Sequence, residues 1–239
     1  MLTENKFGKY LIYAVGEIIL VVIGILIALS INNWNQNQIE KKTINSYLKK
    51  IESNIQQDLK VSQRMLDFRV NTSANCKEAS RMLLDRDFSK QEIIQDAIFG
   101  MVIEFQMNYN RPAFESLKSS GSLSKIDDYD LEDLIYNYYS LVDDVVDAEN
   151  DVQNWSNELE LELDKNGFMV KFIQLDSKVF PTAGEQISLY DDALCEHIGH
   201  GIILNILMRG GLDFASNIKK QIKAGEELSL AIGDYIDRN

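Results

Sequence analysis

The sequence predicts an all-α protein in which a single N-terminal transmembrane helix continues into a long helix of an antiparallel helical bundle. Three observations favour this fold class. A nearly uncharged apolar run covers Leu11–Ile31, the chain of 239 residues holds only two prolines, and long stretches place apolar residues at alternating steps of three and four. Because proline and glycine interrupt helices, their absence from residues 25–99 leaves room for long helices.

The apolar run reads LIYAVGEIILVVIGILIALSI and carries one charge, Glu17. As a helix it is roughly 32 Å long, enough to cross a hydrocarbon core of about 30 Å. We therefore expect a transmembrane helix at residues 10–34, a cytoplasmic N-terminus at residues 1–9 and an extracytoplasmic acidic helical-bundle domain at residues 35–239. The first expected partner is the lipid bilayer.

The flanking charges favour one orientation of this span. Lys6 and Lys9 precede it with only Glu4 against them, whereas the other flank is uncharged as far as Glu40. Because cytoplasmic flanks are enriched in Lys and Arg, the N-terminus is expected inside and the domain outside the bacterial inner membrane.

A cleaved signal peptide is the alternative interpretation, since Ala28, Leu29 and Ser30 form a small-x-small site. Against it, the apolar run is longer than the 7–15 residues typical of a signal peptide. Tyr10, Tyr13 and Trp34 flank the run as interfacial aromatic residues do. These features favour a retained anchor.

The net charge of −13 lies entirely on residues 32–239, because the two acids and two bases before them cancel. A strongly acidic domain argues against nucleic-acid partners, whose phosphates attract Lys and Arg. It also argues against a face that lies flat on anionic lipid.

Apolar periodicity predicts the helices after the span. A long helix is expected to reach about Val70, with a turn near 71–75 before a second piece. Ser89 and Glu92 form a capping-box pattern that opens the next helix. Residues 108–129 read as a connector with a short helical turn and a stop at Gly121.

The most regular pattern begins at Leu131, just past the middle of the chain. Its 3-4 spacing predicts a long helix with a coiled-coil seam; the seam residues are Leu131, Leu134, Tyr138, Leu141, Val145, Ala148, Val152, Trp155 and Leu159. Five acids from Asp143 to Asp151, including Glu149, are interpreted as a solvated face. Residues 166–189 are expected to form a loop or small hairpin, followed by helices at about 190–208 and 212–236.

Glu17 is the first candidate functional residue, because a carboxylate within a span is costly and marks a functional site by default. Glu17, Gly24 and Ala28 fall near one helix face, and Gly24-xxx-Ala28 permits close helix contact. We interpret them as a transmembrane association face for a second copy or a membrane-protein partner. In the alternative, Glu17 lies near enough to the end of the span to reach headgroup water.

A second candidate site lies near the only two histidines. The segment contains Cys195, Glu196, His197 and His200. Histidines at i and i+3 on a helix could hold a divalent ion if an aspartate at 191 or 192, or another helix, completed the shell. No HExxH or CxxC pattern accompanies them, and this absence favours packed or surface histidines. No cofactor is expected.

Two further interpretations concern the cysteines and the acids. Cys76 and Cys195 could form a disulfide outside the cytoplasm, or could be two small buried residues. The acids around Asp128 fail the EF-hand pattern, and we expect them to cap the following helix. No nucleophile elbow, P-loop or dinucleotide fingerprint is present, so the chain is not expected to be an enzyme.

The N-terminal segment, which ends in NNWN, resembles the opening of an uncharacterised family of small single-pass bacterial membrane proteins. The matching residues are Lys9, Tyr10, Gly16, Glu17, Ile18, Gly24, Ala28 and Trp34. Residues 113–122 and 131–139 are also similar to the middle of that family. The resemblance implies a membrane-anchored helical domain and brings no catalytic residues.

These observations lead to an expected function as a non-enzymatic interaction, scaffold or accessory sensory module of the cell envelope. The N-terminal tail of about ten residues is too short for an output domain, so any signal would pass through a partner's membrane helix. The alternative is a small-ligand- or metal-binding envelope domain that uses His197 and His200. A hydrolase is a distant third.

Overall fold

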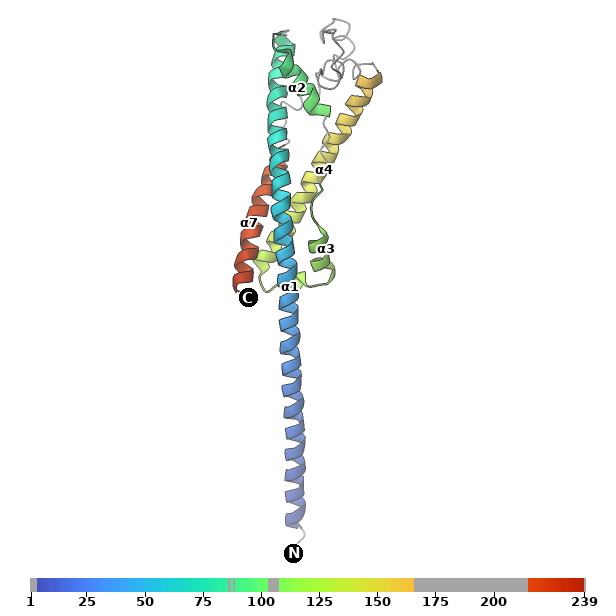
Figure 1. Ribbon diagram of the computed structural model, residues 1–239. Helices are drawn as coiled ribbons and strands as arrows, with labels where there is room; N and C mark the ends of the chain where they lie inside the picture. Colours follow the sequence, from blue (N-terminus) through green and yellow to red (C-terminus); the bar gives the residue numbers. More distant parts are fainter. Residues whose placement is uncertain (1–3, 86, 88, 103–107, 166–214, 239) are drawn as a thin grey trace, which may run out of the picture.

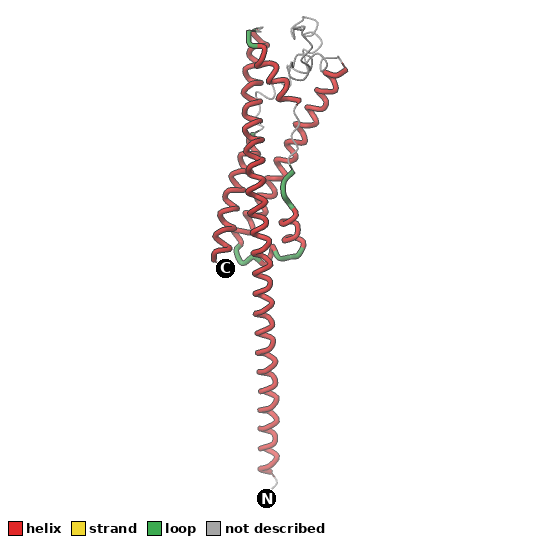
Figure 2. The backbone as a smooth tube through the Cα atoms, viewed as in Figure 1, coloured by secondary structure: helices red, strands yellow, loops and turns green. Residues whose placement is uncertain are grey.

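The structure is a computed structural model that describes residues 4–85, 87, 89–102, 108–165 and 215–238. These residues form five α-helices and one 3-10 turn, with no strand among them (Figures 1 and 2). The predicted all-α class is confirmed for this part of the chain. The segments expected at 166–189 and 190–208 lie outside the described residues.

Helix α1 runs without a break over Glu4–Asp85 and joins the apolar run to the core (Figure 1). Its 82 residues correspond to about 123 Å. The turn predicted near residues 71–75 is wrong. Thr72, Cys76 and Ala79 are buried there. Residues 71–75 have only modest helix propensity, and the packing of this buried face stabilises their helical conformation.

The other elements are shorter than α1 and lie beside its second half (Figure 1). They are α2 (Gln91–Val102), α3 (Pro112–Ser119), the 3-10 turn η1 (Leu123–Lys125), α4 (Tyr129–Lys165) and α7 (Ser216–Arg238). The short helix predicted in the connector is α3. Gly121 follows it with φ of +70°, a conformation that glycine adopts without steric cost.

The directions of α1, α4 and α7 follow from the residues that meet between them. Asp58 meets Tyr138 and Arg69 meets Glu149, each pair 80 residues apart, so α1 and α4 run the same way. Gln221 meets Tyr138 while Tyr235 meets Asp127, so α7 runs opposite to α4. The predicted antiparallel bundle is therefore not confirmed. Helix α7 is antiparallel to α4, but α1 and α4 are parallel.

The main apolar core lies between the middle of α1 (residues 44–59), the first half of α4, α3 and α7. It holds Leu48, Ile51, Ile55, Leu117, Leu131, Ile135, Tyr138, Leu228 and Ile232 among others. Phe114 of α3 stacks on Tyr139 of α4, with ring centroids 3.9 Å apart. A smaller cluster of Met65, Val145 and Ile218 continues this core away from the N-terminal end.

The buried seam of α4 differs from the predicted one. Leu131, Tyr138, Val145 and Val152 are buried as expected. The other buried positions are Ile135, Tyr139, Val142, Glu149 and Ser156, whereas Leu134, Leu141 and Ala148 are half-buried and Trp155 is exposed. The observed seam keeps every second predicted residue and replaces the others by the next residue along, so the buried face is turned by about 50°, half of the 100° between successive residues.

The expected acidic cap of α4 is present. The Leu131 N–H donates to Asp128 Oδ1 over 3.1 Å, and this hydrogen bond satisfies one of the free N–H groups at the start of the helix. The pKa of Asp128 is lowered, chiefly because this backbone hydrogen bond stabilises its charged form.

Candidate functional site

The predicted association face lies on the exposed part of α1. Tyr10–Ile39 are exposed throughout, including Glu17, Gly24 and Ala28. No other atom lies within 4 Å of a Cβ placed on Gly24. Among the described residues, therefore, nothing covers this face, and a partner helix could approach the backbone closely.

The predicted metal site and the predicted disulfide stay predictions. Cys195, Glu196, His197 and His200 lie outside the described part of the chain. Cys76 is buried on α1. Among the described residues, no group of three His, Cys, Asp or Glu side chains could hold a metal ion.

A buried polar cluster lies in the middle of the core, and its centre is Asp58 of α1. Asp58 is only 2% exposed. The backbone N–H of Asn110 donates to its carboxylate over 3.1 and 3.2 Å, and the Asn110 side chain donates over 2.7 Å. Tyr138 Oη lies 3.5 Å from Asp58 Oδ2, at the limit of a hydrogen bond. These contacts fix the connector before α3, and less strongly α4, to α1.

The polar cluster extends to α7 and to a second tyrosine. Gln221 Nε2 of α7 donates to Tyr138 Oη over 3.2 Å, and Ser62 Oγ lies 3.2 Å from Tyr109 Oη. Gln221 Oε1 and Tyr139 Oη are buried without a hydrogen-bond partner among the described residues. The cluster is therefore not fully satisfied, which makes it expensive and sensitive to change.

Burial is the main cause of the shifted pKa values in this cluster. Removal from water raises the pKa of Asp58, and the hydrogen bonds from Asn110 and Tyr138 offset part of that rise. Burial also raises the pKa of Tyr109 to about 12 and raises the pKa of Tyr138, with the nearby Asp58 charge adding to both. Tyr109 and Tyr138 thus remain protonated at neutral pH.

A buried ion pair joins α1 to α4 further along the core. Arg69 Nε donates to Glu149 Oε1 over 3.2 Å, and Arg69 Nη2 pairs with Glu149 Oε2. Both side chains are about 95% buried, with exposures of 5% and 6%. Arg69 Nη1 has no partner among the described residues. Glu149 is therefore a core residue, and its predicted place on the solvated face is wrong.

Sequence reasoning missed Asp58, Arg69 and Glu149 because they are charged. A signal was nevertheless present, since Asp58, Ser62, Met65 and Arg69 continue the 3-4 spacing of Ile51 and Ile55. A charged residue in register with an apolar seam is a candidate for a buried pair.

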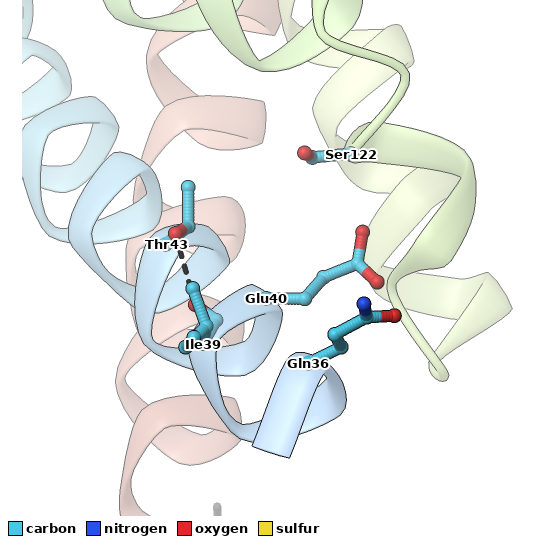
Figure 3. Close-up of a pocket in the computed structure, with 5 residues that line it drawn as sticks. All are labelled: Gln36, Ile39, Glu40, Thr43 and Ser122. Atoms are coloured by element: carbon cyan, nitrogen blue, oxygen red, sulfur yellow. Dashed lines mark hydrogen bonds between the residues drawn. The ribbon is translucent and has the colours of Figure 1, made fainter. Parts of the chain in front are cut away.

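A small pocket lies at the end of the core that is nearest the apolar segment. It has a volume of about 280 Å³ and is lined by Gln36, Ile39, Glu40, Thr43 and Ser122 (Figure 3). Beside it, Lys125 of η1 pairs with Glu40 Oε1. A second pocket of about 320 Å³ lies between α1 and α3, with Tyr47, Lys50 and Asn110 in its lining.

The described residues define an all-helical protein with one helix long and apolar enough, by length and composition, to cross a membrane. Within that class, the chain belongs to the family of unknown function DUF6090, which matches residues 17–176 and so more than half of the chain. The predicted membership of an uncharacterised family is confirmed, while the N-terminal signature and the membrane location stay predictions. No curated protein and no solved structure matches the chain significantly.

Proposed function

We propose that this protein is a single-pass, membrane-anchored helical-bundle protein that acts, without enzymatic activity, as an interaction or scaffold module or as an accessory sensory module of the cell envelope. The observation that carries this proposal is the continuity of α1. One helix contains both the exposed apolar segment and the buried residues Ile44, Leu48 and Ile51 of the core.

The exposed segment supports the membrane anchor on energetic grounds. Its side chains from Leu11 to Ile31 are mostly more than half exposed in the single chain. Burying a Leu, Ile or Val side chain contributes about 1.5–3 kcal/mol. The segment therefore strongly favours lipid, or a partner helix within lipid, over water.

The unbroken helix also supports a role in transmission or assembly. No glycine or proline separates Ile25 from Ile44. A rotation or shift of the membrane segment would therefore be passed to the core along the helix axis. The expected partner that would receive such a movement is a second copy or another membrane protein.

Copurification after crosslinking in native membranes tests this proposal. We expect a specific partner or dimer, with a yield that falls several-fold in Glu17→Ala. Ile19→Ala serves as the control. Ile19 follows Glu17 by two residues and therefore lies on the opposite side of the helix. Equal yields in both variants would contradict the association face, and monomeric wild-type chain without a partner would contradict the interaction role.

The orientation needs its own test. A phosphatase that is active only outside the cytoplasm, fused after α7, should be active, and a fluorescent protein that folds only in the cytoplasm should not fluoresce there. The reverse pattern would place the domain inside the cell.

A further inference from the structure

The pocket at the membrane-side end of the core is lined by one charged residue, Glu40, and by unused polar groups, and Lys125 lies beside it. Glu40 Oε1 pairs with Lys125 Nζ, and Oε2 has no hydrogen bond to a described residue. The Gln36 amide and the Ser122 hydroxyl likewise make no side-chain hydrogen bond with the described part of the chain. Figure 3 shows the Glu40 carboxylate between the Gln36 amide and Ser122.

We propose that this pocket binds the headgroup of an aminophospholipid, a phosphoethanolamine group. This inference rests on the proposed function, because it requires the apolar segment to lie in a bilayer. The lipid ammonium would donate to Glu40 Oε2 and Ser122 Oγ. The lipid phosphate would accept from Lys125 Nζ and from the Gln36 amide.

The position of the pocket along α1 agrees with this ligand. Gln36 and Glu40 follow Trp34 by about 3 and 9 Å along the helix axis. The headgroup layer on each side of a bilayer is about 5–8 Å thick. With Trp34 at the edge of the hydrocarbon, Gln36 lies within the headgroup layer and Glu40 lies at its outer edge, so the pocket faces the ends of the headgroups. Ile39, which lines the pocket, is exposed and could contact the glycerol end of a lipid.

The chemistry of the lining favours ethanolamine over other headgroups. A purely anionic headgroup has no ammonium for Glu40 and is repelled by the acidic domain. A choline headgroup has the same charges as ethanolamine but no N–H donor. The volume of about 280 Å³ suits a headgroup rather than a whole lipid.

The test uses the full chain in nanodiscs that contain two photoactivatable lipids, identical except for an ethanolamine or a choline headgroup. Crosslinks to residues 36–43 are counted by mass spectrometry. We expect about a tenfold preference for ethanolamine, the ratio that one charge-assisted hydrogen bond supplies. Glu40→Gln should abolish the preference.

Two control variants separate the site from general damage. Glu78→Gln removes another exposed, ion-paired acid of α1, about 57 Å further along the helix, and should keep the preference. Lys125→Gln breaks the Glu40–Lys125 pair but leaves the carboxylate, and should also keep the preference, because both lipids carry the phosphate.

Each contrary result has a distinct meaning. A wild-type chain that inserts but crosslinks both lipids equally would overturn the headgroup site and leave the proposed function intact. Loss of the preference in Glu78→Gln or Lys125→Gln would also overturn it. A chain that does not enter nanodiscs at all would overturn both proposals.

Discussion

Charged side chains occupy core positions on both long helices, and each is compensated differently. Asp58 has no basic partner within the described part of the chain, and amide and hydroxyl donors from Asn110 and Tyr138 contact it. Arg69 and Glu149 neutralise each other. A buried charge is costly unless it is paired or hydrogen-bonded, so the two sites should respond differently to pH and to mutation.

Asp58→Asn should become more stable relative to the wild type as the pH rises. Burial raises the pKa of Asp58 above its ordinary value near 3.8, so the folded state holds a proton that the unfolded state has lost. The stability from this group is fully present below pH 3.8 and is lost as the pH rises through the folded pKa. Urea unfolding between pH 3.5 and 7 measures the difference. Asp67→Asn, which removes an exposed acid of α1, is the control, and an equal pH trend in both variants would contradict the assignment.

Glu149→Gln should destabilise the fold by about 3–5 kcal/mol, because it leaves the buried Arg69 charge uncompensated. Asp143→Asn should cost no more than about 1 kcal/mol, because its pair with Arg111 is exposed. Chemical denaturation of both variants at neutral pH gives the comparison. Similar losses would mean that burial does not set the strength of these pairs.

The residue-level errors of the sequence reading have one physical cause. Asp143, Asp144, Asp147 and Asp151 are exposed as predicted, but Glu149 is not. A run of acids looks uniform in the sequence, whereas a helix turns each residue by about 100° from the last. Only the partner Arg69, 80 residues earlier, decides that Glu149 lies inside.

At the scale of elements, α1 and α4 keep one register along the core. The spacing of 80 residues holds for Asp58 with Tyr138 and for Arg69 with Glu149. The buried residues Met65 and Val145, of one cluster, share it. Two parallel helices with matched 4-3 spacing pack in successive layers of side chains. A one-residue insertion in α1 between two of these layers would therefore misalign every layer that follows the insertion.

Gly225→Ala should destabilise the packing of α7 even though alanine favours helices. A Cβ at Gly225 would lie 2.9 Å from Leu59 Cδ2 and 3.0 Å from Tyr138 Cε2. Overpacking of this kind typically costs about 1–3 kcal/mol. Gly233→Ala on the same helix meets nothing within 4 Å and should stabilise by up to about 1 kcal/mol. Thermal unfolding separates the two, and a stabilising Gly225→Ala would contradict this packing.

The helices themselves were largely predictable, and their ends and directions were not. The absence of glycine and proline predicted the long first helix, and Pro112 and Gly121 bracket the predicted short helix α3. The break expected at residues 71–75 did not form, because tertiary burial of Thr72 outweighs local propensity. The shared direction of α1 and α4 depends on contacts 80 residues apart, which local patterns do not contain.

On the scale of the whole molecule, the exposed segment and the core are energetically separate. Residues 10–39 are exposed, and the core begins at Ile44. A chain that starts at Asn32 should therefore keep its thermal midpoint within a few degrees, a shift that corresponds to less than about 1 kcal/mol. It should also move from the membrane pellet to the supernatant. Centrifugation and circular dichroism test both, and a large loss of stability would show that the segment supports the core.

The direction of α7 has a practical consequence for measurements of distance. Arg238 pairs with Asp128 at the end of the core where α1 enters, while the turn around Asp87 lies at the opposite end (Figure 1). Tyr235 Oη donates to Asp127 and holds the end of α7 there. A fluorophore attached after α7 would therefore report on the membrane surface in the proposed orientation. One attached at Asp87 would report on the tip, about 80 Å from Trp34 along the helix axis.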